Sequence, residues 1–192
     1  MSAARDVIAP LLAGINAFDD HEASDLAFAK RWLDATSDVY RRQKPGLPSP
    51  HLVAYFLPVC ASTDRALLVD HLDARAWLPP GGHVEVNEHP SRTVERECAE
   101  ELGVAPRTVA GPCFLTVRTV KNPKSSHIDV SLWYTVELPA GWALKCEPSE
   151  HAGARWWLLA DILSAPAGTV EPNLSRFLRK WRDGGTSTAE NG

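Results

Sequence analysis

Three glutamates in the middle of the sequence constrain the fold of this chain more than any other feature. They are Glu97, Glu100 and Glu101. Pro90 suits a first helical turn, His89 before it is the predicted N-cap, and Gly103 is a typical C-terminal stop, so the segment between them is predicted to be helical. At about 100° per residue, the three glutamates share one side of this helix. A neighbouring apolar stripe consists of Val94, Cys98 and Leu102. The helix can therefore dock on a sheet and still present three carboxylates together.

These carboxylates lack the basic partners that a solvated helix face normally has. The residues four positions further on are Glu101, Val104 and Ala105, so none of the three glutamates has a Lys or Arg four positions beyond it. Clustered carboxylates repel one another at neutral pH, and a bound cation relieves that repulsion. A merely solvated acidic face is the alternative interpretation. Because the ligands are all oxygen atoms, the pattern favours Mg²⁺, with Mn²⁺ as a second option.

The segment 82–104 resembles the Nudix box, a fixed pattern of glycine, glutamate and arginine residues. The matching positions are Gly82, Glu88, Arg96, Glu97, Glu100, Glu101 and Gly103. Cys98 departs from the aliphatic residue usual at its place, and as a small apolar side chain it affects packing rather than chemistry. The resemblance implies an α/β fold, a Nudix-type α/β/α sandwich with a mixed sheet, over residues of about 50 to 165. An N-terminal helical extension lies outside it.

The resemblance also implies roles for the residues of the box. The metal ligands would be the carbonyl of Gly82 and the carboxylates of Glu97, Glu100 and Glu101. Glu88 and Arg96 would pair and hold the loop against the helix. Either Glu97 or Glu101 would act as the general base, and Arg96 belongs with them among the expected catalytic residues.

Acidic residues outside the helix extend this candidate site. Glu150 precedes a predicted strand, at a place where some Nudix enzymes carry a distal metal-binding or base glutamate; Glu147 and His151 are its rivals. Glu85 lies three residues before Glu88 and is expected to approach the metal or the substrate.

Polar residues alternate along one predicted strand, where His127, Asp129 and Ser131 share a face. The opposite face carries Ile128, Val130 and Leu132. The polar face either lines a substrate cleft or faces solvent. We take His127 and Asp129 as candidate substrate-binding residues.

The sequence divides into an N-terminal helical extension over residues 1–45, a Nudix domain over 46–182 and a disordered tail over 183–192. An apolar stripe in the extension comprises Leu26, Ala29, Trp32, Leu33, Thr36, Val39 and Tyr40. Packing of this stripe on the domain is favoured over packing on a partner subunit. The Pro-rich run 44–50 predicts a linker. Further predicted elements are strands over 51–60, 65–71, 107–120 and 127–138, a strand leading into a helix over 154–163, and a helix over 173–181.

Charge and composition restrict the partners. A net charge of −4 argues against a broad nucleic-acid surface, which needs clustered Lys and Arg. No apolar run approaches the roughly 20 residues of a spanning helix, so no membrane partner is expected. The four cysteines have no metal-binding spacing and are read as free thiols of a reducing cytoplasm. The expected partner is a small-molecule nucleotide or other diphosphate, with a homodimer left open.

The expected function is Mg²⁺-dependent hydrolysis of a diphosphate linkage in a nucleoside diphosphate derivative or a nucleoside triphosphate. Two alternatives share the fold, namely a diphosphate isomerase and a nucleotide-binding regulatory module. The Cys and Glu motifs of the isomerase are not found, and the intact acidic set argues against the regulatory module. The substrate within the diphosphate class is not predicted.

Overall fold

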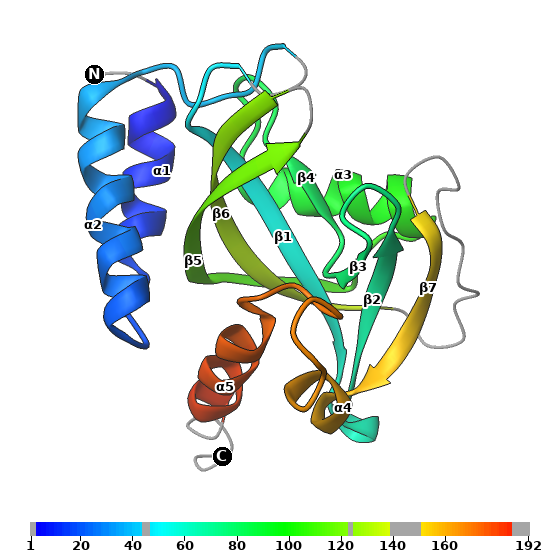
Figure 1. Ribbon diagram of the computed structural model, residues 1–192. Coiled ribbons are helices and arrows are strands. Elements are labelled where there is room, and N and C mark those ends of the chain that lie inside the picture. Colours follow the sequence, from blue (N-terminus) through cyan, green and yellow to red (C-terminus); the bar gives the residue numbers. More distant parts are fainter. Residues whose placement is uncertain (1–2, 44–46, 123–124, 139–150, 186–192) are drawn as a thin grey trace.

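The computed structural model describes residues 3–43, 47–122, 125–138 and 151–185 (Figure 1). The helices are α1 (Ala3–Ala13), α2 (Asp20–Ala35), α3 (Pro90–Leu102), α4 (Leu159–Leu163) and α5 (Leu174–Gly185), with a 3-10 turn, η1 (Ala61–Thr63). The strands are β1 (His51–Cys60), β2 (Arg65–His71), β3 (Ala76–Leu78), β4 (Gly81–His83), β5 (Thr108–Asn122), β6 (Ser125–Glu137) and β7 (His151–Leu158). No helix in these ranges is long and apolar enough to cross a membrane.

The strands form a mixed sheet in the order β3-β2-β1-β6-β5, with β4 paired to β1 and β7 paired to β2. The β1–β6 pair is parallel and sets His51 beside Asp129, whereas the other pairs are antiparallel. Strand β6 pairs with β1 from His51 to Pro58, whereas β4 pairs with only three residues near its start and β2 with its last two residues. The mixed sheet expected from the sequence is confirmed.

Helices cover both faces of the sheet, as an α/β/α sandwich requires. Successive residues of a strand point to opposite faces, and Leu132 and Trp133 of β6 accordingly belong to two different hydrophobic clusters. The first cluster contains the fully buried α3 residues Val94, Cys98 and Leu102. The second contains the α5 residues Leu174, Phe177 and Leu178. The predicted fold class is therefore confirmed.

Helix α3 begins and ends where the sequence predicts. The ring of His89 accepts a hydrogen bond from the Ser91 backbone N–H and so caps the first turn. Gly103 ends the helix in the left-handed region, at a φ of 68°, which glycine adopts without the steric penalty of a side chain. The helix that carries the glutamates is thus fixed by local sequence signals at both ends.

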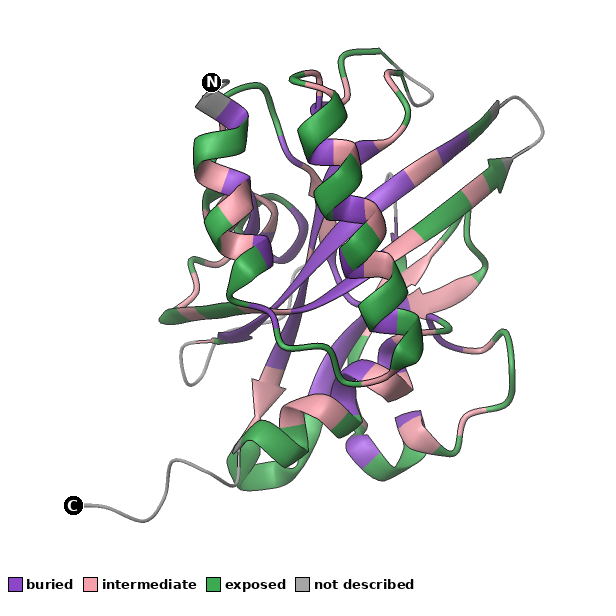
Figure 2. Ribbon diagram, turned by 90° about the vertical axis from the view of Figure 1, so that its left-hand side faces the viewer, coloured by how far each residue is buried: buried purple, intermediate pink, exposed green. Residues whose placement is uncertain are grey.

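The N-terminal helices pack on the sheet rather than standing apart from it. Ile8, Leu12, Leu26, Ala29 and Leu33 are buried in the same cluster as the sheet residues beneath α3. Figure 2 shows buried residues recurring along both helices and along the strands behind them. The preference for packing on the domain is confirmed.

The predicted helical stripe is too long, because α2 ends at Ala35. Thr36 is extended, with a φ of −142°, and its hydroxyl accepts the Asp38 backbone N–H at 3.0 Å. The Val39 carbonyl accepts the Leu52 N–H at 2.8 Å and is thus bonded to the start of β1. Val39 is buried, as expected, but it reaches the core from a loop whose backbone is bonded to the sheet.

Glu22 of α2 joins three parts of the fold. Its side chain is fully buried, with 0% exposure, and accepts hydrogen bonds from the Leu115 N–H of β5 at 3.1 Å and from the Lys180 ammonium of α5 at 2.7 Å. It also accepts the Phe18 N–H at 2.7 Å. Because β5 is the last strand in the sheet order, Glu22 satisfies a backbone donor that the sheet does not pair. The N-terminal extension is therefore bonded to the sheet as well as packed against it.

The C-terminal helix is longer than the sequence predicts, since α5 continues to Gly185 and takes in the start of the predicted tail. The Arg182 guanidinium contacts both oxygens of Asp64, at 2.9 and 3.0 Å, and this contact anchors the last turn. Residues 186–192 of the predicted tail lie outside the described ranges.

In the predicted linker, the Ser49 hydroxyl accepts the Ile128 N–H at 2.8 Å, so this part is bonded to β6.

Candidate active site

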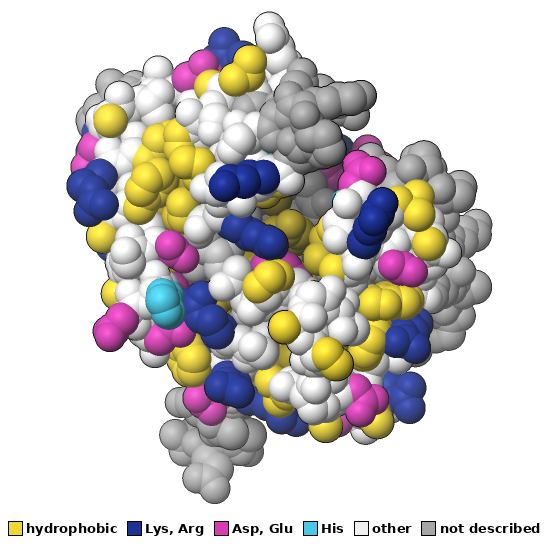
Figure 3. Space-filling view, viewed as in Figure 1, with side chains coloured by type: hydrophobic (Ala, Val, Ile, Leu, Met, Phe, Trp, Pro, Cys, Tyr) yellow, Lys and Arg dark blue, Asp and Glu magenta, His cyan; other side chains and the backbone are white. Residues whose placement is uncertain are grey.

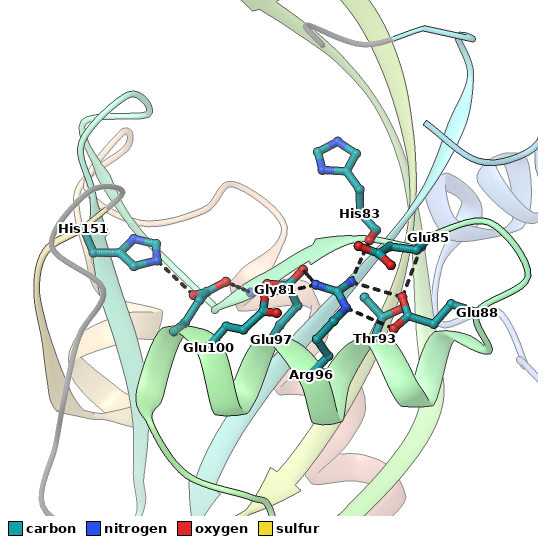
Figure 4. A network of polar contacts seen from close by, with 10 residues as sticks. Gly81, His83, Glu85, Glu88, Thr93, Arg96, Glu97, Glu100 and His151 are labelled. Carbon is teal, nitrogen blue, oxygen red and sulfur yellow. Dashed lines mark hydrogen bonds and ion pairs between the residues drawn. The ribbon is translucent and has the colours of Figure 1, made fainter. Parts of the chain in front are cut away.

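Arg96 of α3 organises the box residues through its planar guanidinium group (Figure 4). Its Nε and Nη2 atoms donate to the two oxygens of Glu88 at 3.0 and 3.1 Å, which is the expected Glu88–Arg96 pair. Nη1 donates to Glu97 at 2.7 Å and to Glu100 at 3.2 Å. Nη2 also reaches the His83 carbonyl at 3.1 Å. A single side chain thus connects the loop before the helix, two of the glutamates and strand β4.

Glu88 holds the loop that leads into α3. It accepts hydrogen bonds from the Thr93 hydroxyl at 2.7 Å and from the Glu85 backbone N–H at 3.1 Å. Burial alone would raise the pKa of the Glu88 carboxyl, but the hydrogen bonds from Arg96 and Thr93 lower it below the usual value. Glu88 is therefore ionised at neutral pH, and its hydrogen bonds hold the loop in place. Glu85 is exposed beside it.

Gly82 brings the backbone of β4 against Glu97. A Cβ atom at this position would collide with the Glu97 carboxylate, so only glycine permits this approach. The pKa of Glu97 is raised to about 7, first by burial and also by the nearby Glu101 and Glu100, against the opposing effect of Arg96. The negative charge of Glu97 is thus poorly compensated by the protein alone.

Glu101 is the most buried of the three glutamates, with 5% of its surface exposed. One carboxylate oxygen accepts the Gly81 N–H at 3.1 Å, and the other lies 3.0 Å from Nε2 of His151 on β7. The sequence named His151 only as a rival of Glu150 and did not predict this contact. No local pattern signals it, because the two residues meet only when β7 pairs with β2.

Two candidates of the predicted site cannot be placed. Glu150 and its rival Glu147 lie outside the described residues, so a catalytic role for Glu150 stays a prediction.

Glu100 is the exposed member of the acidic set, with 60% of its side chain accessible. Glu95, one residue before Arg96, pairs with Arg92 instead and lies outside the network.

The polar residues of β6 lie inside the protein. His127, Asp129 and Ser131 are all buried, which rules out the interpretation of this face as a solvated outer surface. His127 and Asp129 meet two histidines from other strands, His51 of β1 and His83 of β4. Neither of these was predicted from the sequence, since only the sheet register joins them. Burial, and next the positive charge of Arg41, lower the pKa of His83 to about 3.

The box residues fit a hard divalent cation. Glu97, Glu100, Glu101 and the backbone at Gly82 offer only oxygen donors, which Mg²⁺ and Mn²⁺ prefer. The pKa of Glu97 is raised mainly by burial and also by Glu101 and Glu100, so a cation beside this carboxylate stabilises its ionised form. Gly82 keeps the backbone close enough to the carboxylates for both to bind one ion.

A mixed-sheet α/β/α sandwich with this box on α3 defines a hydrolase of the Nudix class. The NUDIX domain family model matches residues 50–181, and the chain belongs to this family. A NUDIX-family hydrolase from Clostridium perfringens is 26% identical, with a TM-score of 0.52 over 69% of this chain and 96% of that chain. A comparison with curated proteins gave no match.

Two further solved structures share the fold at lower identity. The NUDIX domain of Shewanella oneidensis NrtR, complexed with ADP ribose, is 22% identical, with a TM-score of 0.53 over 69% of this chain and 86% of that chain. An Ap4A hydrolase from C. elegans is 17% identical, with a TM-score of 0.54 over 70% of this chain and 97% of that chain. Residues 1–49, which include α1 and α2, precede the family match.

Proposed function

We propose that the protein is a Mg²⁺-dependent pyrophosphohydrolase that cleaves a diphosphate linkage in a nucleoside diphosphate derivative or a nucleoside triphosphate. The observation that carries the proposal is the set of three carboxylates that α3 presents beside the Gly82 backbone. Arg96 positions Glu97 and Glu100, and the Gly81 N–H positions Glu101. Mn²⁺ has the same preference for oxygen ligands and is the alternative ion.

The chain supplies binding and proton transfer at this site. Glu97, Glu100, Glu101 and the Gly82 carbonyl are the proposed ligands of the cation. When bound, the ion neutralises the diphosphate oxygens and lowers the pKa of a bound water. Glu97 and Glu101 are the candidates for the base that accepts a proton from the attacking water, with Glu150 as a candidate from the segment outside the described residues. Arg96 positions the helix carboxylates through its hydrogen bonds to Glu88 and His83.

One face of the molecule carries basic side chains that suit an anionic substrate. Figure 3 shows Lys and Arg side chains over β5 and β6, beside a hollow in the surface. Arg118 of β5 keeps 49% of its side chain exposed, although it lies 3.5 Å from the buried Glu171. ADP ribose, the ligand of the NrtR domain, is a nucleoside diphosphate derivative, and this supports the same class of substrate here. The roles of Glu85, His127 and Asp129 as substrate-binding residues stay predictions, and the burial of His127 and Asp129 favours a role inside the protein for these two.

The three cysteines within the described ranges, Cys60, Cys98 and Cys113, are free thiols, which supports the proposal of a reducing compartment such as the cytoplasm.

A substrate panel tests the proposed function. The full-length chain is incubated with ADP-ribose, nucleotide sugars, dinucleoside polyphosphates, nucleoside triphosphates and isopentenyl diphosphate, with Mg²⁺, with Mn²⁺ or with EDTA. Products are separated by chromatography and identified by mass. We expect release of a nucleoside monophosphate from at least one nucleotide with Mg²⁺ and none with EDTA. Turnover of none of the nucleotides with either cation, or undiminished turnover in EDTA, would contradict the proposal.

A further inference from the structure

Three imidazoles and one carboxylate converge from three strands at one place in the sheet. His51 is the first residue of β1, His83 the last residue of β4, and His127 and Asp129 lie near the start of β6. The register produces the cluster, because His51 stands beside Asp129 in the parallel pair and His83 stands opposite Val53, two residues along β1. One potential ligand atom from each of the four side chains lies within 4.8 Å of the other three.

The cluster is buried except for the half-buried His83, and four of its polar atoms lack a hydrogen-bond partner. His51 is 0% exposed, His127 7% and Asp129 8%. Among the described residues, no hydrogen-bond partner exists for Nε2 of His51, Nε2 of His83, Nδ1 of His127 or Oδ1 of Asp129. A buried polar atom without a partner destabilises a fold by about 1–3 kcal/mol. Nε2 of His51 nevertheless lies 3.0 Å from Oδ1 of Asp129, and Nε2 of His127 lies 3.4 Å from the same oxygen. The donor atoms thus gather around one carboxylate oxygen, where a further group can be bound.

The tautomer of His51 supports a cation as that group. Its Nδ1 lies 2.7 Å from the Pro48 carbonyl, which can only accept, so Nδ1 carries the proton. In neutral His51, the Nε2 lone pair then faces the Asp129 oxygen at 3.0 Å, and a lone pair facing a carboxylate oxygen is repulsive. A cation between the two atoms converts this repulsion into ligation. A backbone carbonyl that fixes the outer nitrogen is also the usual second-shell partner of a metal-binding histidine.

The donor atoms indicate which cation binds. Imidazole nitrogens with one carboxylate suit first-row transition metals and Zn²⁺, whereas Mg²⁺ prefers an all-oxygen shell. We propose that His51, His83, His127 and Asp129 form a second metal site that binds Zn²⁺ or a chemically similar first-row dication. This site is distinct from the box, because the ring of His83 points away from the box glutamates (Figure 4).

The second site would fix the strand from which the box glycine comes. His83 follows Gly82 directly, and its carbonyl accepts a hydrogen bond from Arg96 at 3.1 Å. A metal bound by His83 of β4 and by the ligands from β1 and β6 would hold these three strands together. The bound ion therefore stabilises the strand geometry on which the box depends, in a positioning role.

Metal analysis of the full-length chain tests the proposal. The protein is stripped with a chelator, dialysed against Zn²⁺ in an excess of Mg²⁺, and analysed by mass spectrometry for metal per chain. We expect one tightly held Zn²⁺, a rise in the thermal midpoint on loading, and a zinc affinity at least about 100-fold lower in Asp129→Asn and His127→Gln. Glu97→Gln in the box and His21→Gln, an exposed histidine of α2, are the controls and should keep the ion.

Two results would overturn the second site. One is wild-type protein that retains no more zinc than Asp129→Asn, which would leave a buried His51–Asp129 ion pair as the function of the cluster. The other is unchanged zinc affinity in both cluster variants, which would assign the ion to surface histidines. If the variants do not fold, X-ray absorption of zinc-loaded wild-type protein decides, since imidazole ligands support the site and a shell without imidazole overturns it.

Discussion

Replacing the buried Glu22 by glutamine is the sharpest test of how the N-terminal extension is held. Glu22→Gln keeps the size of the side chain but removes its charge and turns one acceptor oxygen into a donor. In the native protein the two oxygens accept from the backbone N–H groups of Phe18 and Leu115 and from the Lys180 ammonium. An amide in this place leaves one of these donors facing another donor, and Lys180 loses its charged partner.

The expected loss follows from these contacts. One buried donor without a partner costs about 1–3 kcal/mol. Lys180, with only 16% of its side chain exposed, adds a part of the roughly 3–5 kcal/mol seen when a buried ion pair loses one member. We expect Glu22→Gln to lower the free energy of unfolding by about 3 kcal/mol. For a chain of this length that corresponds to a thermal midpoint lower by roughly 6–12 °C.

Urea unfolding at pH 7, followed by tryptophan fluorescence, measures the effect. Lys180→Met and the double variant complete a mutant cycle, and the double variant should be more stable than the sum of the single losses predicts. Asp20→Asn, an exposed change in the same helix, is the control. A loss below about 1 kcal/mol for Glu22→Gln, or strict additivity in the cycle, would refute the reasoning.

Three further predictions concern the extension and the box. Removing residues 1–43 should leave a domain that folds, as judged by circular dichroism and size exclusion, with a lower thermal midpoint and preserved turnover; a well-folded but inactive truncation would show that the extension builds the active site. Arg176 lowers the pKa of Asp19 to about 2 from 3.8, so this pair stabilises the fold above about pH 4 and the contribution disappears as the pH falls through 2. Asp19→Asn should therefore cost about 1 kcal/mol at pH 7, after a discount for partial exposure, and much less at pH 2 in urea titrations, whereas a pH-independent loss would contradict the assignment. Arg96→Lys keeps the charge but loses the planar two-bond contact with the loop glutamate, so turnover should fall by at least about tenfold while the fold is retained; wild-type kcat in a folded variant would contradict the positioning role.

The features that could be predicted from the sequence are those that local signals specify. The Pro90 start and the Gly103 stop fix helix α3, and its acidic face follows from the helical period alone. The strand and hairpin segments follow from apolar runs and turn residues in the same way. Here the physical cause of the structure lies within a few residues of the pattern that predicts it.

The features that could not be predicted depend on residues far apart in the chain. Glu22 is a polar residue of a charged helix, and its burial makes sense only with Leu115 and Lys180, which are 93 and 158 residues away. The spacing of His51, His83 and His127 in the sequence gives no metal-binding signal. The antiparallel β1–β4 pair brings in His83, and the parallel β1–β6 pair brings in the histidine and aspartate of β6. Val39 is likewise buried from a loop beyond α2, whose backbone is bonded to Leu52 at the start of β1.

The central claim is that the α3 carboxylates bind the cation needed for hydrolysis, and a Mg²⁺ titration of turnover in matched variants tests it most directly. With the best nucleotide of the panel, Glu97→Gln and Glu100→Gln should each lower kcat by at least about 10²-fold, with unchanged circular dichroism. Glu95→Gln, whose side chain pairs with Arg92 outside the network, should keep the wild-type rate and the wild-type Mg²⁺ dependence. Equal small effects at all three positions would show that the acidic face is merely solvated and would contradict the account.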